Sequence, residues 1–106
     1  MVKIPDFVIE KIELFLNELK NNQIHIERSI LFGSYVKGTY NEWSDIDLAI
    51  VSDDFSGNSF EDKCQIRKFK SKSSWDISPL PFRKDDFEKS IFARDEIIKN
   101  GIIILW

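Results

Sequence analysis

The stretch Ser29-Ile30-Leu31-Phe32-Gly33-Ser34 decides the fold together with Asp45-Ile46-Asp47-Leu48-Ala49-Ile50-Val51, which follows after ten intervening residues. The first stretch is a dense apolar run that stops at a glycine, as in a strand buried on both faces. In the second stretch, alternation puts the two aspartates on one face and the large aliphatic side chains on the other. A tight turn and a short helix fill ten residues, so we expect the second strand to return beside the first.

The turn Gly33-Ser34-Tyr35-Val36-Lys37-Gly38-Thr39 follows the first strand. A glycine at a strand end lets a ligand approach the backbone, and a helix that begins at Ser34 directs N–H groups toward an anion. Asp45 and Asp47 share one strand face with Cα atoms about 6.5 to 7 Å apart, so they can converge on one divalent cation. An isolated Asp-x-Asp is more often a solvated strand start. Beside a turn suited to bind phosphate, however, the pair resembles a metal–triphosphate site.

The remaining patterns predict one α/β (α+β) domain over residues 1–106, with a mixed sheet of four to five strands flanked by helices. Ile4, Val8, Ile12, Phe15, Leu16 and Leu19 predict an amphipathic helix over the first 22 residues. We expect a loop over 52–59, a helix with Phe60, Cys64 and Lys68 on one face, an edge strand over 75–80 containing Pro79, a helix over 83–100 and a buried final strand over 102–105.

Composition excludes several classes of protein. With 42% hydrophobic residues in 106, the chain has the means to fold as one domain. No apolar run approaches the ~18 residues that cross a bilayer, and acidic residues interrupt the N-terminal stretch where a signal peptide is apolar, so we expect a cytoplasmic protein without membrane contact. One Cys and one His exclude an internal disulfide and zinc ligand sets, and a net charge of −3 argues against extended nucleic-acid binding.

The motif as a whole is similar to that of one family. Phe32-Gly33-Ser34, ten residues and then Asp45-Ile46-Asp47-Leu48, with Gly38 and Ser44 in place, resemble the signature of the DNA polymerase β-like nucleotidyltransferases. The closest resemblance is to the minimal nucleotidyltransferases. It extends over nearly the whole chain, because the leading helix, the strand around Asp76 and the closing apolar strand also fit that layout.

The resemblance implies a two-metal transfer of a nucleoside monophosphate, AMP from ATP, to a hydroxyl group. Asp45 and Asp47 would hold Mg²⁺, and Gly33 and Ser34 would bind the β- and γ-phosphates. Asp76 matches the third carboxylate, which with the other two holds the second Mg²⁺ near the acceptor hydroxyl. One ion lowers the pKa of the hydroxyl, and the other stabilises the charge on the leaving pyrophosphate.

Other residues around this motif have two readings each. Lys37 and Ser44 complete the nucleotide-binding set, but Lys37 stands where many relatives carry arginine and lacks its bidentate fork, so it is a phosphate ligand or a solvated helix residue. Tyr40 and Trp43 either stack on a base or pack. The basic residues Lys63, Arg67, Lys68, Lys70 and Lys72 form a solvated face or receive phosphate or an acidic partner.

The spacing of these residues excludes two similar motifs. Lys37 precedes Gly38, unlike the lysine of a Walker A loop, and Ile50 replaces the glycine of a calcium loop.

Because the chain reaches Trp106 without a helical acceptor domain, we expect a separate protein to supply the acceptor. The resemblance implies a HEPN-type toxin, silenced by AMP on a tyrosine. The alternative is a catalytically weak nucleotide-binding or regulatory subunit that completes a larger transferase, and homo-oligomers through a sheet edge stay open.

Overall fold

The computed structural model describes residues 4–41, 43–69 and 76–105. In chain order the elements are α1 (Asp6–Asn21), β1 (Arg28–Phe32), α2 (Ser34–Lys37), β2 (Ile46–Val51), α3 (Ser59–Arg67), β3 (Ile77–Phe82), α4 (Lys84–Lys89), the π-helical segment η2 (Ala93–Ile98) and β4 (Ile102–Leu105). Within these described ranges, no helix has both the length and the hydropathy needed to cross a bilayer.

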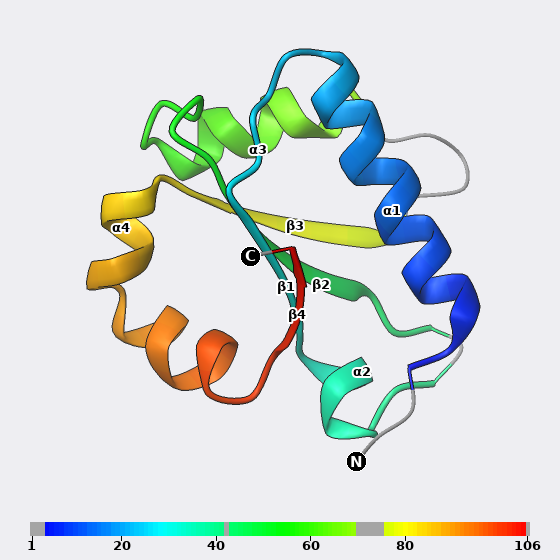
Figure 1. The fold of residues 1–106 in the computed structure, drawn as a ribbon. Coiled ribbons are helices and arrows are strands. Elements are labelled where there is room, and N and C mark those ends of the chain that lie inside the picture. Colours follow the sequence, from blue (N-terminus) through cyan, green and yellow to red (C-terminus); the bar gives the residue numbers. More distant parts are fainter. Residues whose placement is uncertain (1–3, 42, 70–75, 106) are drawn as a thin grey trace.

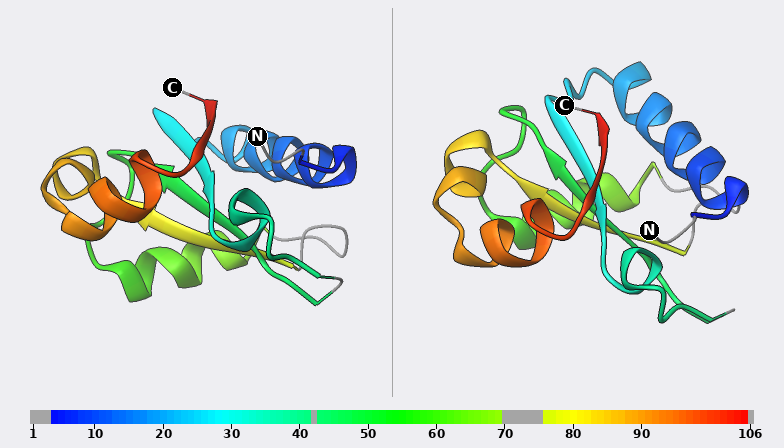
Figure 2. Two further views of the ribbon diagram at one scale, coloured as in Figure 1. Left: turned by 90° about the horizontal axis from the view of Figure 1, so that it is seen from below. Right: turned by 60° about the horizontal axis from the view of Figure 1, so that its bottom comes forward.

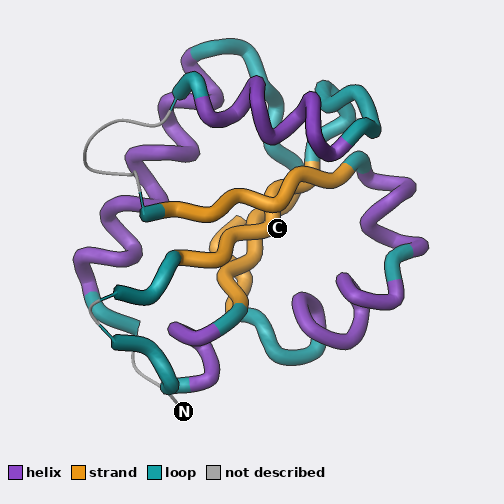
Figure 3. Tube along the Cα trace, turned by 180° about the vertical axis from the view of Figure 1, so that it is seen from behind, coloured by secondary structure: helices purple, strands orange, loops and turns teal. Residues whose placement is uncertain are grey.

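The strands form one mixed sheet with the order β3-β2-β1-β4. Strand β1 is antiparallel to both β2 and β4, whereas β3 is parallel to β2. Figure 3 shows the strands in the centre of the molecule with the helices around them. The sequence-based prediction of a mixed α/β fold is confirmed, and so is the return of the second strand beside the first, with Asp47 opposite Phe32.

Two hydrophobic layers cover the two faces of the sheet. Ile46, Leu48 and Ile50 of β2 face a cluster that includes the buried stripe of α1 and Ile66 of α3. Ala49 and Val51 of β2 face the other cluster, which includes residues of α4 and η2. Figures 1 and 2 show α1 and α4 on opposite sides of the sheet. The alternation predicted for β2 is therefore confirmed.

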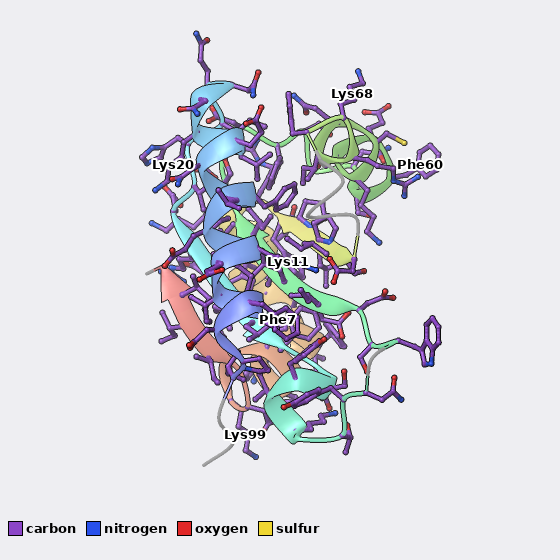
Figure 4. All side chains as sticks on the ribbon, turned by 90° about the vertical axis from the view of Figure 1, so that its right-hand side faces the viewer. Phe7, Lys11, Lys20, Phe60, Lys68 and Lys99 are labelled. Atoms are coloured by element: carbon purple, nitrogen blue, oxygen red, sulfur yellow. The ribbon has the colours of Figure 1, made fainter. Side chains whose placement is uncertain are left out.

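Helix α3 has a different buried face from the predicted one. Phe60 is 75% exposed and Cys64 and Lys68 are also exposed, whereas Asp62 and Ile66 are buried. Figure 4 shows Phe60 and Lys68 pointing away from the body of the protein. The reason is that the Asp62 carboxylate accepts hydrogen bonds from Ser56 N and Oγ and from Gly57 N, at 2.8, 2.9 and 3.1 Å, which offsets its desolvation.

The helix predicted over 83–100 is interrupted. α4 ends at Lys89, and Ser90 has an extended backbone with ψ 123° before the chain continues into η2. The Ser90 hydroxyl accepts a hydrogen bond from Ala93 N at 3.1 Å, as an N-cap serine does, and so starts a new helical segment. As a result Ile91 and Phe92, which lie within the helix predicted over 83–100, are 68% and 48% exposed.

Both outer strands differ in part from their predictions. Strand β4 is an edge strand whose Ile103 is 58% exposed, so the prediction of a buried final strand is wrong. Strand β3 is an edge strand, as Pro79 indicated, but it extends to Phe82 and includes Pro81. Trp75, predicted to begin this strand, lies outside the described residues.

Candidate active site

The ends of three strands that carry site residues meet at one end of the sheet. Because β1 and β2 are antiparallel, the last residue of β1 lies beside the first residues of β2, and Phe32 pairs with Asp47. Because β3 is parallel to β2, it begins at the same end, where Ile46 N donates to the carbonyl of Asp76 at 2.9 Å. The topology therefore brings the Gly33-Ser34 turn, the aspartate pair and Asp76 to one region.

Gly33 and Asp47 are in direct contact. Gly33 has φ 82° and ψ −150°, a backbone conformation that L side chains rarely adopt. A Cβ atom on this residue would overlap Oδ2 of Asp47 and lie 3.0 Å from its Cγ. The Gly33 carbonyl then accepts the N–H groups of Val36 and Lys37, each at 3.1 Å, which starts α2. Glycine is thus required here both by the turn and by the carboxylate that rests on it.

Asp45 and Asp47 form a pair of like charges. The pKa of Asp47 is raised above its usual range, first by burial of the half-buried carboxyl and second by the charge of Asp45, which is itself exposed. Among the described residues, no basic side chain contributes to this shift. A cation that binds both carboxylates would relieve the desolvation and the repulsion together, and carboxylate oxygens are the ligands that Mg²⁺ prefers.

Asp76 is held by Lys11 of α1, a residue that no sequence motif identified. Lys11 Nζ lies 2.9 Å from Asp76 Oδ2, and the Asp76 side chain is only 14% exposed. The other oxygen, Oδ1, is buried and has no hydrogen-bond partner in the described structure. Lys11 Nζ also lies 5.5 Å from the ring centroid of Phe7. Figure 4 shows Lys11 reaching from α1 toward the starts of β2 and β3.

Two tyrosines pack beside these charges. Tyr35 of α2 is buried and stacks on Tyr40, with ring centroids 4.5 Å apart and an interplanar angle of 16°. The pKa of Tyr35 is raised, mainly by burial and then by the charge of Asp76, while Lys11 acts in the opposite direction. Of the two readings for Tyr40, the structure shows packing. Trp43 is 83% exposed.

Lys37 and Ser44 make contacts of their own outside the turn. Lys37 forms an ion pair with Glu96 of η2 at 3.4 Å, and both side chains are about half exposed. The Ser44 hydroxyl accepts Asn41 N at 2.9 Å, and Ser44 N donates to the Asn41 carbonyl at 3.1 Å. Trp43 N donates to Asn41 Oδ1 at 2.8 Å. Ser44 therefore orders the loop that leads into Asp45.

The carboxylates fit a hard divalent cation, although they are not gathered into one cluster. Within residues 4–41, 43–69 and 76–105, no three His, Cys, Asp or Glu side chains come together as a metal-binding group. The donors are the Asp45–Asp47 pair and, beside it, Asp76 engaged by Lys11. Two observations on the described residues fit a cation: no basic side chain there offsets the repulsion between Asp45 and Asp47, and Asp76 Oδ1 is buried there without a hydrogen-bond partner.

Two other surfaces are separate from these residues. Among the basic residues noted after the first loop, Arg67 and Lys68 are exposed at the end of α3, and Lys70 and Lys72 lie outside the described residues. A groove of about 590 Å³ lies at the far end of β3 and is lined by Leu80, Phe82, Phe92 and neighbouring residues. The groove contains none of the candidate site residues.

Comparisons with known proteins agree on a family and a fold. A family model described as a nucleotidyltransferase domain matches residues 9–104. A protein of Methanocaldococcus jannaschii named "Putative protein adenylyltransferase" is 51% identical over 43 residues, which are 40% of this chain and 43% of that protein's length. A structure described as "a putative nucleotidyltransferase from Sulfolobus solfataricus" matches with a TM-score of 0.65 over 91% of this chain and 78% of its own, at 16% identity. A toxin–antitoxin structure with AMP-PNP matches with a TM-score of 0.62 over 92% and 72%, at 24% identity.

Proposed function

The chain belongs to the nucleotidyltransferase domain family, and from this premise we propose that it transfers AMP from ATP to a hydroxyl group of another molecule in a Mg²⁺-dependent reaction. One observation carries the proposal. The carboxylate of Asp47 rests on Gly33, beside Asp45, so a turn suited to phosphate and a pair of carboxylates suited to a cation occupy one place. A metal-bound triphosphate requires both.

The proposed reaction is a displacement at the α-phosphorus. The acceptor oxygen forms a bond to this phosphorus, the bond from phosphorus to the oxygen that bridges the α- and β-phosphates breaks, and pyrophosphate leaves. The hydroxyl proton passes to solvent. When bound, two Mg²⁺ ions would lower the pKa of the hydroxyl and stabilise the charge on pyrophosphate. Asp45 and Asp47 would hold them, and Asp76 would contribute to the one nearer the acceptor.

The turn residues would hold the triphosphate. The chain turns at Gly33 and enters α2 at Ser34, and the N–H groups at the start of a helix are suited to an anion, so we assign the β- and γ-phosphates to Gly33 and Ser34. Lys37 reaches phosphate only by leaving Glu96, so we give it a secondary role. Ser44 contributes through the loop that presents Asp45.

The acceptor in this proposal is a tyrosine of a HEPN-type helical toxin, which the transfer of AMP would silence. Two comparisons support it: the relative from Methanocaldococcus jannaschii is named as a protein adenylyltransferase, and one structural match is a toxin–antitoxin structure with AMP-PNP. In this proposal the chain acts as an antitoxin, and its substrate is ATP.

The test is transfer to a candidate partner. The protein is incubated with Mg²⁺, each of the four nucleoside triphosphates and a HEPN-type toxin, and intact mass spectrometry of the toxin should show the addition of one AMP group with ATP. Asp45→Asn and Asp47→Asn should abolish the addition, while Asp95→Asn, a neutralised exposed aspartate on η2, should not. Absence of an adduct together with absence of Mg²⁺-dependent nucleotide binding would overturn the proposal.

A further inference from the structure

Lys11 gives Asp76 a positive charge from within the protein. Its ammonium lies 2.9 Å from Asp76 Oδ2, and the two side chains are 26% and 14% exposed. The ion pair joins residues 65 positions apart, one on α1 and the other at the start of β3. A largely buried pair of this kind is screened less by solvent and salt than an exposed one.

The pairing leaves Asp76 half satisfied. Each oxygen of an ionised carboxylate can accept hydrogen bonds or bind a metal ion. Asp76 Oδ1, however, is buried without a hydrogen-bond partner in the described structure. An unmet buried acceptor costs free energy. Lys11, held also over the Phe7 ring at 5.5 Å, engages only the other oxygen. Lys11 therefore holds Asp76 through Oδ2, while Oδ1 has no hydrogen-bond partner among the described residues.

A second cation at Asp76 would encounter the charge of Lys11. Two positive charges that share one carboxylate repel each other, and this repulsion is largest where burial lowers the effective dielectric constant. The ammonium is on a flexible four-carbon stem, so it has the means to withdraw when a stronger cation takes its place. The favourable interaction between Lys11 and Asp76 is then replaced by the interaction between Asp76 and the metal ion.

We propose that Lys11 is an internal counter-ion of Asp76, which neutralises this carboxylate in the metal-free protein and competes with a divalent cation for it. Lys11 is thus a positioning residue that acts through Asp76 and sets the affinity of the acceptor-side metal. This inference rests on the proposed function, because it takes Asp76 to be a ligand of that metal. The other reading is that the ion pair only fastens α1 to β3.

Manganese binding to the metal-free protein separates the two readings. Titrations followed by electron paramagnetic resonance should show that Lys11→Met and Lys11→Gln bind the Asp76-dependent ion about tenfold more tightly than the unmodified protein, which corresponds to about 1.4 kcal/mol. Lys11→Arg keeps the charge and should change the affinity little. In an Asp76→Asn background, Lys11→Met should have no further effect.

Lys20→Met is the matched control. Lys20 is also on α1 and exposed, nine residues or about 13 Å further along the helix, and Figure 4 shows it on the opposite side of α1 from Lys11. Its neutralisation changes the net charge equally but should leave manganese affinity unchanged. If Lys20→Met and Lys11→Met have equal effects, general charge and not a counter-ion explains them.

Thermal unfolding gives a second readout. In EDTA, Lys11→Met should lower Tm because Asp76 loses its counter-ion, and saturating Mn²⁺ should remove this difference because the cation replaces the ammonium. A difference in Tm that persists in Mn²⁺, or an unchanged manganese affinity in Lys11→Met, overturns the inference. If manganese binding is lost in Asp45→Asn but unchanged in Lys11→Met, the inference fails and the proposed function stands. If neither the unmodified protein nor Lys11→Met binds manganese, the inference and the proposed function both fail.

Discussion

The carboxylate of Asp47 lies against the α-carbon of Gly33, so closely that the space of a Cβ atom on Gly33 is already taken by Asp47 Oδ2. This contact follows from the register of the sheet, in which Asp47 is opposite Phe32, the last residue of β1. The turn from β1 into α2 and the Asp47 carboxylate of β2 therefore pack directly against each other. Changes to either residue should affect the other.

Gly33→Ala should damage both stability and the site. Its Cβ would have to displace the Asp47 carboxylate, and alanine at φ 82° adds backbone strain. We expect a loss of about 1–3 kcal/mol in the free energy of unfolding, measured by urea denaturation. We also expect weaker binding of Mg²⁺–ATP, measured by calorimetry at temperatures where the variant is folded.

Gly57→Ala separates these two effects. Gly57 also has positive φ, 94°, but a Cβ atom on this residue would meet side chains outside the site, with Arg83 Cδ nearest at 3.3 Å and Asp86 Oδ2 at 3.8 Å. The substitution should therefore carry the backbone cost without moving Asp47, and nucleotide affinity should stay as in the unmodified protein. Equal nucleotide affinities in the two alanine variants would contradict the assignment of the Gly33 turn.

Asp47 should make the metal-free protein less stable as pH rises. Its pKa in the folded state is raised by burial and by Asp45, so the folded protein binds this proton more tightly than the unfolded chain does. Stability from this group is complete below the unfolded pKa and is lost as pH rises through the higher folded value. Asp47→Asn should accordingly raise Tm in EDTA at neutral pH, and the gain should shrink toward pH 4.

Added metal should reverse this order. With Mg²⁺ the unmodified protein gains stability through the ionised pair, whereas Asp47→Asn gains little. Calorimetric scans of both proteins between pH 4 and 8, with EDTA or with Mg²⁺, give the four curves that are needed. A Tm for Asp47→Asn in EDTA at or below that of the unmodified protein at neutral pH would refute the prediction.

The centre of the fold could be predicted because its signals are local. The apolar run of β1, the glycine turn and the alternation in β2 lie within 23 consecutive residues, from Ser29 to Val51, and each pattern specifies its own backbone. The outer elements depend on tertiary context. A buried Asp62 reverses the apolar face of α3, and the break at Ser90, whose hydroxyl accepts a hydrogen bond from Ala93 N, divides an otherwise helical pattern.

The site was only partly accessible to sequence reasoning for the same reason. Gly33, Asp45 and Asp47 meet because a short connection joins neighbouring strands, which the spacing indicates. Lys11 meets Asp76 across 65 positions, and nothing near either residue marks the pair. The exposure of β4 was also missed, because an all-apolar strand does not reveal whether it is central or at an edge.

Lys37 and Glu96 should have opposite effects on nucleotide affinity. In the proposed function Lys37 reaches phosphate after leaving Glu96, from which it is 3.4 Å away. Glu96→Gln should therefore strengthen Mg²⁺–ATP binding and Lys37→Ala weaken it, each by up to about fivefold, because an exposed ion pair contributes about 1 kcal/mol or less. Fluorescence titration with a labelled ATP analogue measures both.

Unfolding of the same two variants is the control for that titration. Since both side chains are about half exposed, each substitution should change the free energy of unfolding by less than about 1 kcal/mol. If Lys37→Ala leaves nucleotide affinity unchanged, Lys37 is a solvated residue and only its pairing with Glu96 remains.

Asp62→Ala should be among the most destabilising changes outside the site. The Asp62 carboxylate is 3% exposed and accepts two hydrogen bonds from Ser56 and one from Gly57, at the end of β2 opposite to the aspartate pair. Its removal takes the shared acceptor away from the Ser56 and Gly57 donors and empties a buried position, for which we expect a loss of about 1–3 kcal/mol in urea denaturation. Glu61→Ala, at the exposed neighbouring position, should cost no more than about 1 kcal/mol. Because the loop before α3 lies far from Gly33, the folded fraction of Asp62→Ala should bind Mg²⁺–ATP as the unmodified protein does, and a loss of affinity equal to that of Gly33→Ala would show that the two ends of β2 are coupled.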